Sequence, residues 1–70
     1  MTFDYENKLD ETSWQLLQAL QEDARLSYAE LGRRVSLSPP AVAERVRKME
    51  EIGIITGYRV EINAEKIGLP

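Results

Sequence analysis

The chain contains neither cysteine nor histidine, and for 70 residues this double absence constrains the fold more than any single motif. A domain of this size buries only about 60% of the surface that its unfolded chain exposes, so its stability is marginal. Small domains commonly add disulfides, a metal or a partner subunit. Disulfides, zinc fingers and catalysis by a His or Cys side chain are excluded here. We therefore expect an oligomer, or a piece of a larger protein.

The remaining composition is that of an ordinary soluble domain. Hydrophobic residues make up 43% of the chain and charged residues 30%. No apolar run is long enough to span a membrane, and the first eight residues are too acidic for a signal peptide. A short helical chain also offers little room for a substrate cleft. The sequence predicts a cytoplasmic protein that is not an enzyme, with no membrane partner, bound metal or cofactor.

Charge is distributed unevenly along the chain. The formal net charge is −3, which by itself argues against nucleic acid as a partner. Residues 1–30 carry a net charge of −5, whereas residues 33–48 carry five basic side chains against Glu44 alone, a net charge of +4. Local potential steers a polyanion more than total charge does, so one basic face is expected.

Capping signals predict the first two helices. Residues 1–8 show no periodicity and are expected to form a flexible arm. Asp10 is a good N-cap, and the leucines that follow have helical spacing, which predicts a helix over 11–22. Ser27 and Glu30 fit a capping box, which predicts a second, short helix over 28–35.

The third predicted helix is basic and begins with two prolines. Ser38 is its expected N-cap, and Pro39 and Pro40 occupy the first turn, where proline is tolerated. The helix is predicted over 38–52, with Gly53 as a left-handed C-cap.

The apolar period changes after the third helix. Tyr58, Val60 and Ile62 alternate with charged residues, which predicts a half-buried β-strand. An unpaired strand edge is a liability unless it is covered. We expect a two-fold mate to cover it, with dimer contacts at Tyr58, Val60 and Ile62 and at Trp14 on the first helix.

Residues 28–47 meet most physical requirements of a helix-turn-helix motif. Gly32 supplies the small residue that close helix approach needs, but Ser36 stands at the turn, where glycine is usual. Arg45 stands at a position that is usually apolar. The predicted fold is mainly α: a three-helix helix-turn-helix (winged-helix-like) DNA-binding domain, followed by one β-strand leading to a hinge. The alternative is a helix-turn-helix module used for protein–protein interaction without DNA binding.

The combined pattern resembles the Lrp/AsnC (feast/famine) family of transcription regulators over residues 9–68. The matching residues are Leu9-Asp10, Leu16-Leu17, Leu20, Asp23-Ala24-Arg25, Glu30-Leu31, Leu37-Ser38-Pro39, Arg45-Val46-Arg47-Lys48-Met49-Glu50, Gly53-Ile54-Ile55, Gly57-Tyr58, Asn63 and Gly68. Ser13 and Ser36 depart from it, since the family commonly has Asp and Gly there.

The resemblance implies an AsnC-type helix-turn-helix domain over 9–63 and a hinge over 64–70. In this family the hinge leads to a C-terminal domain that binds amino acids and builds dimers and higher oligomers. That domain is absent from this chain, so any amino-acid effector would bind outside it. The expected partners are double-stranded DNA and a second copy of the chain, bound as a dimer to a pseudo-palindromic operator.

The DNA-binding candidates lie on the second and third helices. In a helix-turn-helix the second helix of the motif enters the major groove. Glu44 could accept a hydrogen bond from cytosine or pair with Lys48, and Arg45 could touch phosphate or pair with an acid of the first helix. Tyr28 could donate its hydroxyl to phosphate or pack against the third helix. The full set of candidates is Tyr28, Arg33, Arg34, Ser38, Pro39, Pro40, Ala43, Glu44, Arg47 and Lys48.

Overall fold

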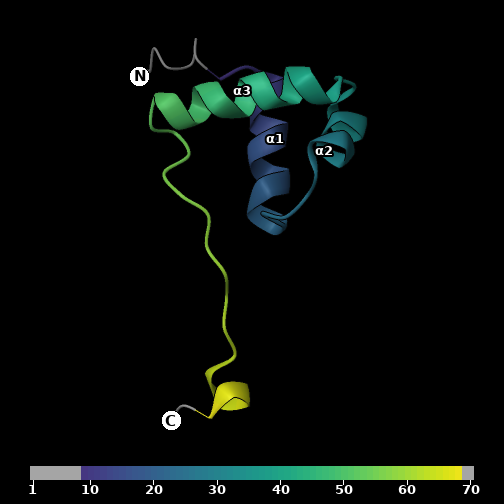
Figure 1. The fold of residues 1–70 in the computed structure, drawn as a ribbon. Coiled ribbons are helices and arrows are strands. Elements are labelled where there is room, and N and C mark those ends of the chain that lie inside the picture. Colours follow the sequence, from purple (N-terminus) through teal and green to yellow (C-terminus); the bar gives the residue numbers. More distant parts are fainter. Residues whose placement is uncertain (1–8, 69–70) are drawn as a thin grey trace.

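The computed structural model describes residues 9–68, which form three α-helices and one short 3-10 helix (Figure 1). Their bounds are α1 Glu11–Glu22, α2 Tyr28–Val35, α3 Pro39–Glu51 and η2 Ala64–Ile67. The first two predicted helices are confirmed, and the third differs by one residue at each end, where the caps lie. The arm predicted over 1–8 and the last two residues of the predicted hinge lie outside the described residues.

Each α-helix begins where a side chain can satisfy its free backbone donors. Asp10 accepts from the amide of Ser13 at 2.9 Å, and Ser38 accepts from the amide of Ala41 at 3.3 Å. Ser27 and Glu30 form the complete capping box, each side chain accepting from the other residue's amide. These caps explain why the helix starts could be predicted from the sequence.

The turn between α2 and α3 is tight because backbone groups meet there. Ser36 adopts the left-handed conformation (φ 60°, ψ 45°), and the amides of Ser36 and Leu37 both donate to the carbonyl of Gly32. A Cβ added at Gly32 would lie 2.2 Å from the carbonyl oxygen of Leu37. The turn therefore requires a positive φ at Ser36. It also requires glycine at residue 32, because the Leu37 carbonyl leaves no room for a side chain there.

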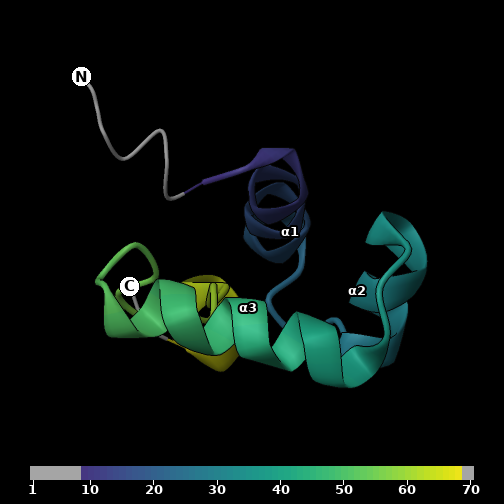
Figure 2. The same ribbon diagram turned by 90° about the horizontal axis from the view of Figure 1, so that it is seen from above.

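The core lies where the three helices meet. Figures 1 and 2 show α3 lying crosswise to α1, with α2 beside the first half of α3. The fully buried side chains are Leu16 on α1, Leu31 on α2, and Val42 and Val46 on α3; Met49 and Ala19 complete the cluster. One stripe of α3 therefore packs against both other helices, which leaves its opposite face exposed.

A glycine ends α3 and returns the chain to the core. Gly53 has φ +83°, its amide donates to Glu50, and the amide of Ile54 donates to Met49 at 2.9 Å. This is the Schellman arrangement that a C-terminal glycine predicts. Ile54 and Ile55 then pack against the core cluster.

The β-strand expected at 58–62 is not formed: residues 9–68 contain no strand. A strand needs a paired neighbour for its backbone hydrogen bonds, and residues 9–68 offer it none. The strands that a winged-helix-like domain would have are likewise absent from residues 9–68, so that part of the predicted fold is not confirmed. The segment instead runs away from the helices (Figure 1), and the radius of gyration is 14.8 Å, against about 11 Å for a compact chain of this length. None of the helices within residues 9–68 has the length and apolar content that crossing a membrane requires.

Candidate nucleic-acid interface

The outward face of α3 carries most of the predicted interface. Ser38, Pro39, Pro40, Glu44, Arg47 and Lys48 are exposed, and Ala43 is half-buried. These residues lie opposite the buried stripe of Val42, Val46 and Met49, so one surface presents them together.

The N-terminus of α3 offers no free amide to an anion. Pro39 and Pro40 have no N–H group. The amide of Ala41 donates to the Ser38 side chain at 3.3 Å, and that of Val42 donates to the Ser38 carbonyl at 3.0 Å. Helix N-termini often bind phosphate through such amides, so here side chains must supply the contacts.

The basic candidates of α2 lie in its last turn. Arg33 and Arg34 are exposed there. The guanidinium of Arg34 lies 4.0 Å from the carboxylate of Glu22, with both side chains more than half exposed, so this pair is weak and easily exchanged. Tyr28, at the other end of α2, is 45% exposed.

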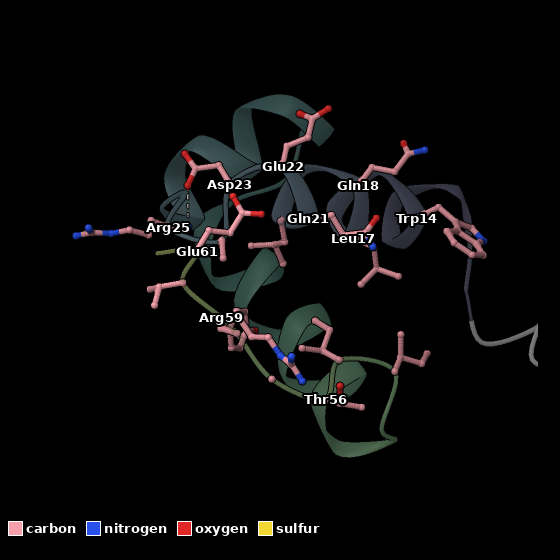
Figure 3. Close-up of a pocket in the computed structure, with 17 residues that line it drawn as sticks. Trp14, Leu17, Gln18, Gln21, Glu22, Asp23, Arg25, Thr56, Arg59 and Glu61 are labelled. Atoms are coloured by element: carbon pink, nitrogen blue, oxygen red, sulfur yellow. Dashed lines mark hydrogen bonds between the residues drawn. The ribbon is translucent and has the colours of Figure 1, made fainter. Parts of the chain in front are cut away.

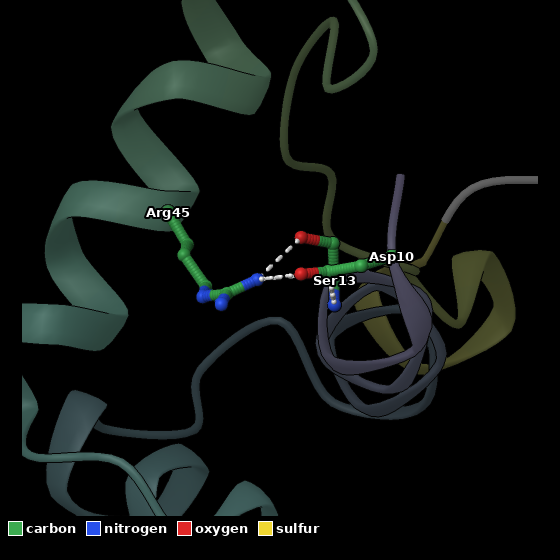
Figure 4. Close-up of polar contacts among 3 residues, drawn as sticks. All are labelled: Asp10, Ser13 and Arg45. Atoms are coloured by element: carbon green, nitrogen blue, oxygen red, sulfur yellow. Dashed lines mark hydrogen bonds and ion pairs between the residues drawn. The ribbon is translucent and has the colours of Figure 1, made fainter. Parts of the chain in front are cut away.

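Arg45 lies off this face and joins α3 to α1 (Figure 4). Its Nη1 donates to both carboxylate oxygens of Asp10 at 2.8 Å and to the buried Ser13 hydroxyl at 3.2 Å. The hydrogen bond from Arg45 is the main cause that lowers the pKa of Asp10 to about 2. The ion-pair alternative for Arg45 is confirmed. The role of Ser13 had no sequence signal beyond its place on the inner face of α1.

Glu44 pairs with Arg47, and not with Lys48 as one of the two alternatives for Glu44 had it. Two nitrogens of Arg47 contact Glu44, the closer at 2.6 Å, and Nη1 of Arg47 contacts Glu51. The planar guanidinium fits a carboxylate bidentately, which an ammonium group cannot do. The Arg47 hydrogen bond lowers the pKa of the Glu44 carboxyl, and Glu44 in turn raises the pKa of Arg47.

A second surface feature lies on the other side of the molecule, between α1 and the segment after α3. This open groove has a volume of about 1070 Å³. Figure 3 shows the residues that line it, which come from α1, from residues 23–25 after it and from residues 54–61. The predicted dimer residues Trp14, Tyr58 and Val60 line it, whereas Ile62 lies just beyond. Sequence reasoning missed Leu17, Leu20, Ile54 and Ile55, which line the groove as well. All four are partly buried and also pack against the core cluster.

Tyr58 reaches back to α3 from the groove. Its hydroxyl donates to the Glu50 carboxylate at 2.7 Å. Partial burial, followed by this hydrogen bond, raises the pKa of Tyr58 to about 12. The alternating pattern of the segment gave no sign of this contact.

Known proteins resemble the chain in both sequence and fold. The chain is 49% identical over 63 residues to the HTH-type transcriptional regulator LrpC of Bacillus subtilis, covering 90% of this chain and 44% of LrpC. It is 44% identical over 61 residues to the leucine-responsive regulatory protein of Rhizobium meliloti, covering 87% of this chain and 39% of that protein.

Solved structures agree with these matches. The structure of B. subtilis LrpC superposes with a TM-score of 0.78 at 48% identity, covering 89% of this chain and 44% of that one. A transcriptional regulator from Neisseria meningitidis, solved as a complex with L-Met, superposes with a TM-score of 0.79 at 39% identity, covering 84% and 38%. The chain thus spans about two fifths of the length of the relatives it matches.

A family match covers the helical part of the chain. Residues 9–50, from just before the N-cap of α1 to the next-to-last residue of α3, match the AsnC-type helix-turn-helix domain. With the relatives above, this shows that the chain belongs to the Lrp/AsnC family of helix-turn-helix transcription regulators, which are not enzymes.

Proposed function

We propose that this chain is the sequence-specific DNA-binding part of a transcription regulator and that α3 enters the major groove. The observation that carries the proposal is the exposed outward face of α3, which presents Arg47 and Lys48 on an AsnC-type helix-turn-helix. A helix-turn-helix reads base edges with the first turns of its second helix. DNA binding would place its action in the cytoplasm.

Base contacts would come from the N-terminal half of α3. Pro39, Pro40 and Ala43 offer apolar surface, and neither proline can donate a backbone hydrogen bond. Glu44 and Arg47 are the side chains with the hydrogen-bonding groups that cytosine and guanine match. With few such groups, sequence-dependent DNA shape and bending would supply a share of the specificity.

Phosphate contacts would come from charged groups around that half. Arg47 and Lys48 on α3 and Arg33 and Arg34 on α2 are exposed, and the Tyr28 hydroxyl could add a hydrogen bond. Such contacts release counterions from DNA and make affinity fall steeply with salt. Hydrophobic association with a protein partner, the alternative function, would not show this dependence.

We also propose that the chain binds DNA as a homodimer. The groove beside α1 is lined by apolar and polar side chains in about equal number, and three of the large apolar ones are exposed: Trp14, Tyr58 and Val60, the last to 79%. If residues 58–62 of two chains paired antiparallel across a two-fold axis, each segment would become a β-strand. The second chain would then cover the groove. The two α3 helices would then lie about 34 Å apart, one DNA turn, facing a pseudo-palindromic operator.

Higher oligomers and any amino-acid effector would depend on a C-terminal ligand-binding domain, for which residues 64–70 would serve as the hinge. The relative solved with L-Met is consistent with such an effector. This chain's own residues would contribute DNA recognition and a weak dimer contact.

The test of DNA binding compares Lys48→Ala with Lys66→Ala. Both remove one exposed lysine side chain, but Lys66 lies in η2, outside the helix-turn-helix and outside the proposed pairing segment 58–62. We expect Lys48→Ala to weaken binding and to reduce the slope of log K against log salt by about one, with the helical circular dichroism unchanged. Lys66→Ala should leave both unchanged. Equal affinity and slope for wild type and Lys48→Ala would remove Lys48 from the interface.

The test of the dimer uses Val60→Pro, which removes a donor from the proposed strand pairing. Sedimentation should shift from dimer toward monomer, and half-site binding should persist while full-site binding loses cooperativity. A wild-type chain that stays monomeric at high concentration and binds half and full sites equally would contradict the dimer.

A further inference from the structure

Three side chains form a row along the exposed face of α3, with Arg47 between two carboxylates. Nε and Nη2 of Arg47 face the two oxygens of Glu44, at 3.4 and 2.6 Å, and Nη1 contacts Glu51. All three guanidinium nitrogens therefore carry a carboxylate contact within the helix. We call Glu44, Arg47 and Glu51 the carboxylate clamp.

The spacing of Glu44, Arg47 and Glu51 along α3 brings the three side chains of the carboxylate clamp together. Residues three and four apart lie on one helix face, and Arg47 follows Glu44 by three positions and precedes Glu51 by four. The paired oxygens of Glu44 match the fork of the guanidinium, the geometry of the stronger carboxylate pairs. The row carries a net charge of −1 on a surface that would face a polyanion.

Lys48, the basic residue next to Arg47, differs from it in its ion pairs. Lys48 is exposed on the same helix, and no carboxylate within residues 9–68 lies in ion-pair contact with it. Lys48 can contact phosphate without giving up a partner, whereas Arg47 must first leave two. Breaking one exposed ion pair lowers the DNA-binding constant about twofold, so breaking both pairs of Arg47 lowers it about fourfold.

We propose that Glu44 and Glu51 are positioning residues that hold Arg47 away from DNA phosphates and thereby lower the affinity of α3 for DNA. The proposal rests on the proposed function. It assigns Glu51, which lies at the last position of α3 and outside the candidate base contacts, a role that it exerts through Arg47.

The experiment measures binding of a fluorescently labelled duplex of mixed sequence by anisotropy, across a potassium chloride series, with the full chain. Glu51→Gln should bind about twofold tighter, and Glu44→Gln with Glu51→Gln about fourfold tighter. The slope of log K against log salt should steepen by up to about 0.9 in the double variant, because the released guanidinium neutralises one phosphate. Loss of an acid near a helix C-terminus favours the helix dipole, so the fold should persist.

Two controls separate the carboxylate clamp from a general change in charge. Glu65→Gln removes the same charge from η2, where the Glu65 side chain takes part in no hydrogen bond or ion pair found within residues 9–68, and it should leave affinity unchanged. In an Arg47→Ala background, Glu51→Gln should also have no effect, because the group it acts through is gone.

Several outcomes would overturn the proposal. Unchanged or weaker binding by Glu51→Gln would do so, as would equal tightening with and without Arg47, since that would show direct repulsion. These results would leave DNA binding by the wild-type chain standing. A wild-type chain that binds no duplex even at low salt would overturn the proposed function together with this inference.

Discussion

Val46 and Val60 are the same residue type, but they lie in two regions of the molecule that differ in packing. Val46 is 1% exposed within the helical unit, residues 9–55, whereas Val60 is 79% exposed in the tail, residues 56–68. Both positions belong to apolar patterns that predict regular structure. An α-helix satisfies its own backbone hydrogen bonds and needs only a surface to pack on, but a strand needs a second strand. The helical unit meets the first need internally, whereas residues 9–68 contain no second strand to meet the other.

The largest effect should come from emptying the core of the helical unit. Leu31→Ala removes a fully buried side chain and should cost about 2–5 kcal/mol, a large share of the stability of so small a domain. Val60→Ala should change the free energy of unfolding of the monomer by less than about 0.5 kcal/mol. Urea unfolding at low protein concentration measures both. Similar costs for the two variants would show that the tail is packed in solution and would break the comparison.

Two glycines offer the same contrast in backbone terms. Gly32→Ala places a Cβ 2.2 Å from the backbone oxygen of Leu37, whereas a Cβ at Gly57 meets nothing within 4 Å. We expect Gly32→Ala to cost about 1–3 kcal/mol, because the turn must open to admit the methyl group. Gly57→Ala should be neutral or slightly stabilising, since it restricts the unfolded chain. Thermal unfolding of the two variants in parallel would decide, and a stable Gly32→Ala would contradict the close approach.

The helical unit and the tail also differ in how much of their structure the sequence predicts. The helices and the end of α3 were predictable because their signals are local: Asp10, Ser27 and Ser38 cap helices within three residues, and Gly53 needs only its own φ. The strand was not, because the alternation around Val60 states which face would be buried but not which neighbour would bury it. The exposed face of α3 followed directly from its buried stripe. The partners on it did not, since Glu44 had two basic residues within reach and only side-chain geometry selects Arg47 over Lys48.

The third effect concerns the strained residue in the motif. Ser36 has φ 60° without being glycine, which costs about 1 kcal/mol. Ser36→Gly should therefore raise the melting temperature by about 4–8 °C while leaving DNA affinity unchanged, because Ser36 lies in the turn before α3. Differential scanning calorimetry with a binding assay would show both. A lower melting temperature would mean that the serine makes a hydrogen bond the turn needs.

The fourth effect tests the polar link inside the helical unit, between α1 and α3. The folded-state pKa of Asp10 is about 2, below its ordinary value of 3.8, so its ion pair with Arg45 stabilises the fold above that ordinary value. This stabilisation should be lost as pH falls from 3.8 to about 2. Because the Asp10 side chain is 58% exposed, solvent screening limits it to about 0.5–1 kcal/mol.

Asp10→Asn keeps an N-capping oxygen but lacks the titrating charge. Its urea midpoint should therefore lie below that of the wild type at neutral pH and converge with it in acid. A constant difference across the pH series would show that the pair adds nothing beyond the cap.

The smallest effect tests the one polar link between the two regions, the hydrogen bond from the Tyr58 hydroxyl to Glu50. Both groups lie at the surface, so Tyr58→Phe should change the free energy of unfolding at neutral pH by less than about 0.5 kcal/mol. The titration of the phenol is a sharper probe. Partial burial and then the Glu50 hydrogen bond raise the pKa of Tyr58 to about 12, from an ordinary value of 10.0.

A raised phenol pKa means that the fold favours the protonated form, so this contribution to stability is present below pH 10 and is lost as pH rises from 10 to about 12. The difference in ultraviolet absorbance between wild type and Tyr58→Phe isolates this phenolate from the other two tyrosines. Glu50→Gln should lower the midpoint only part of the way, because burial is the larger cause. A midpoint at 10 in the wild type would show that the tail does not rest on α3, and the two regions would then be independent in the monomer.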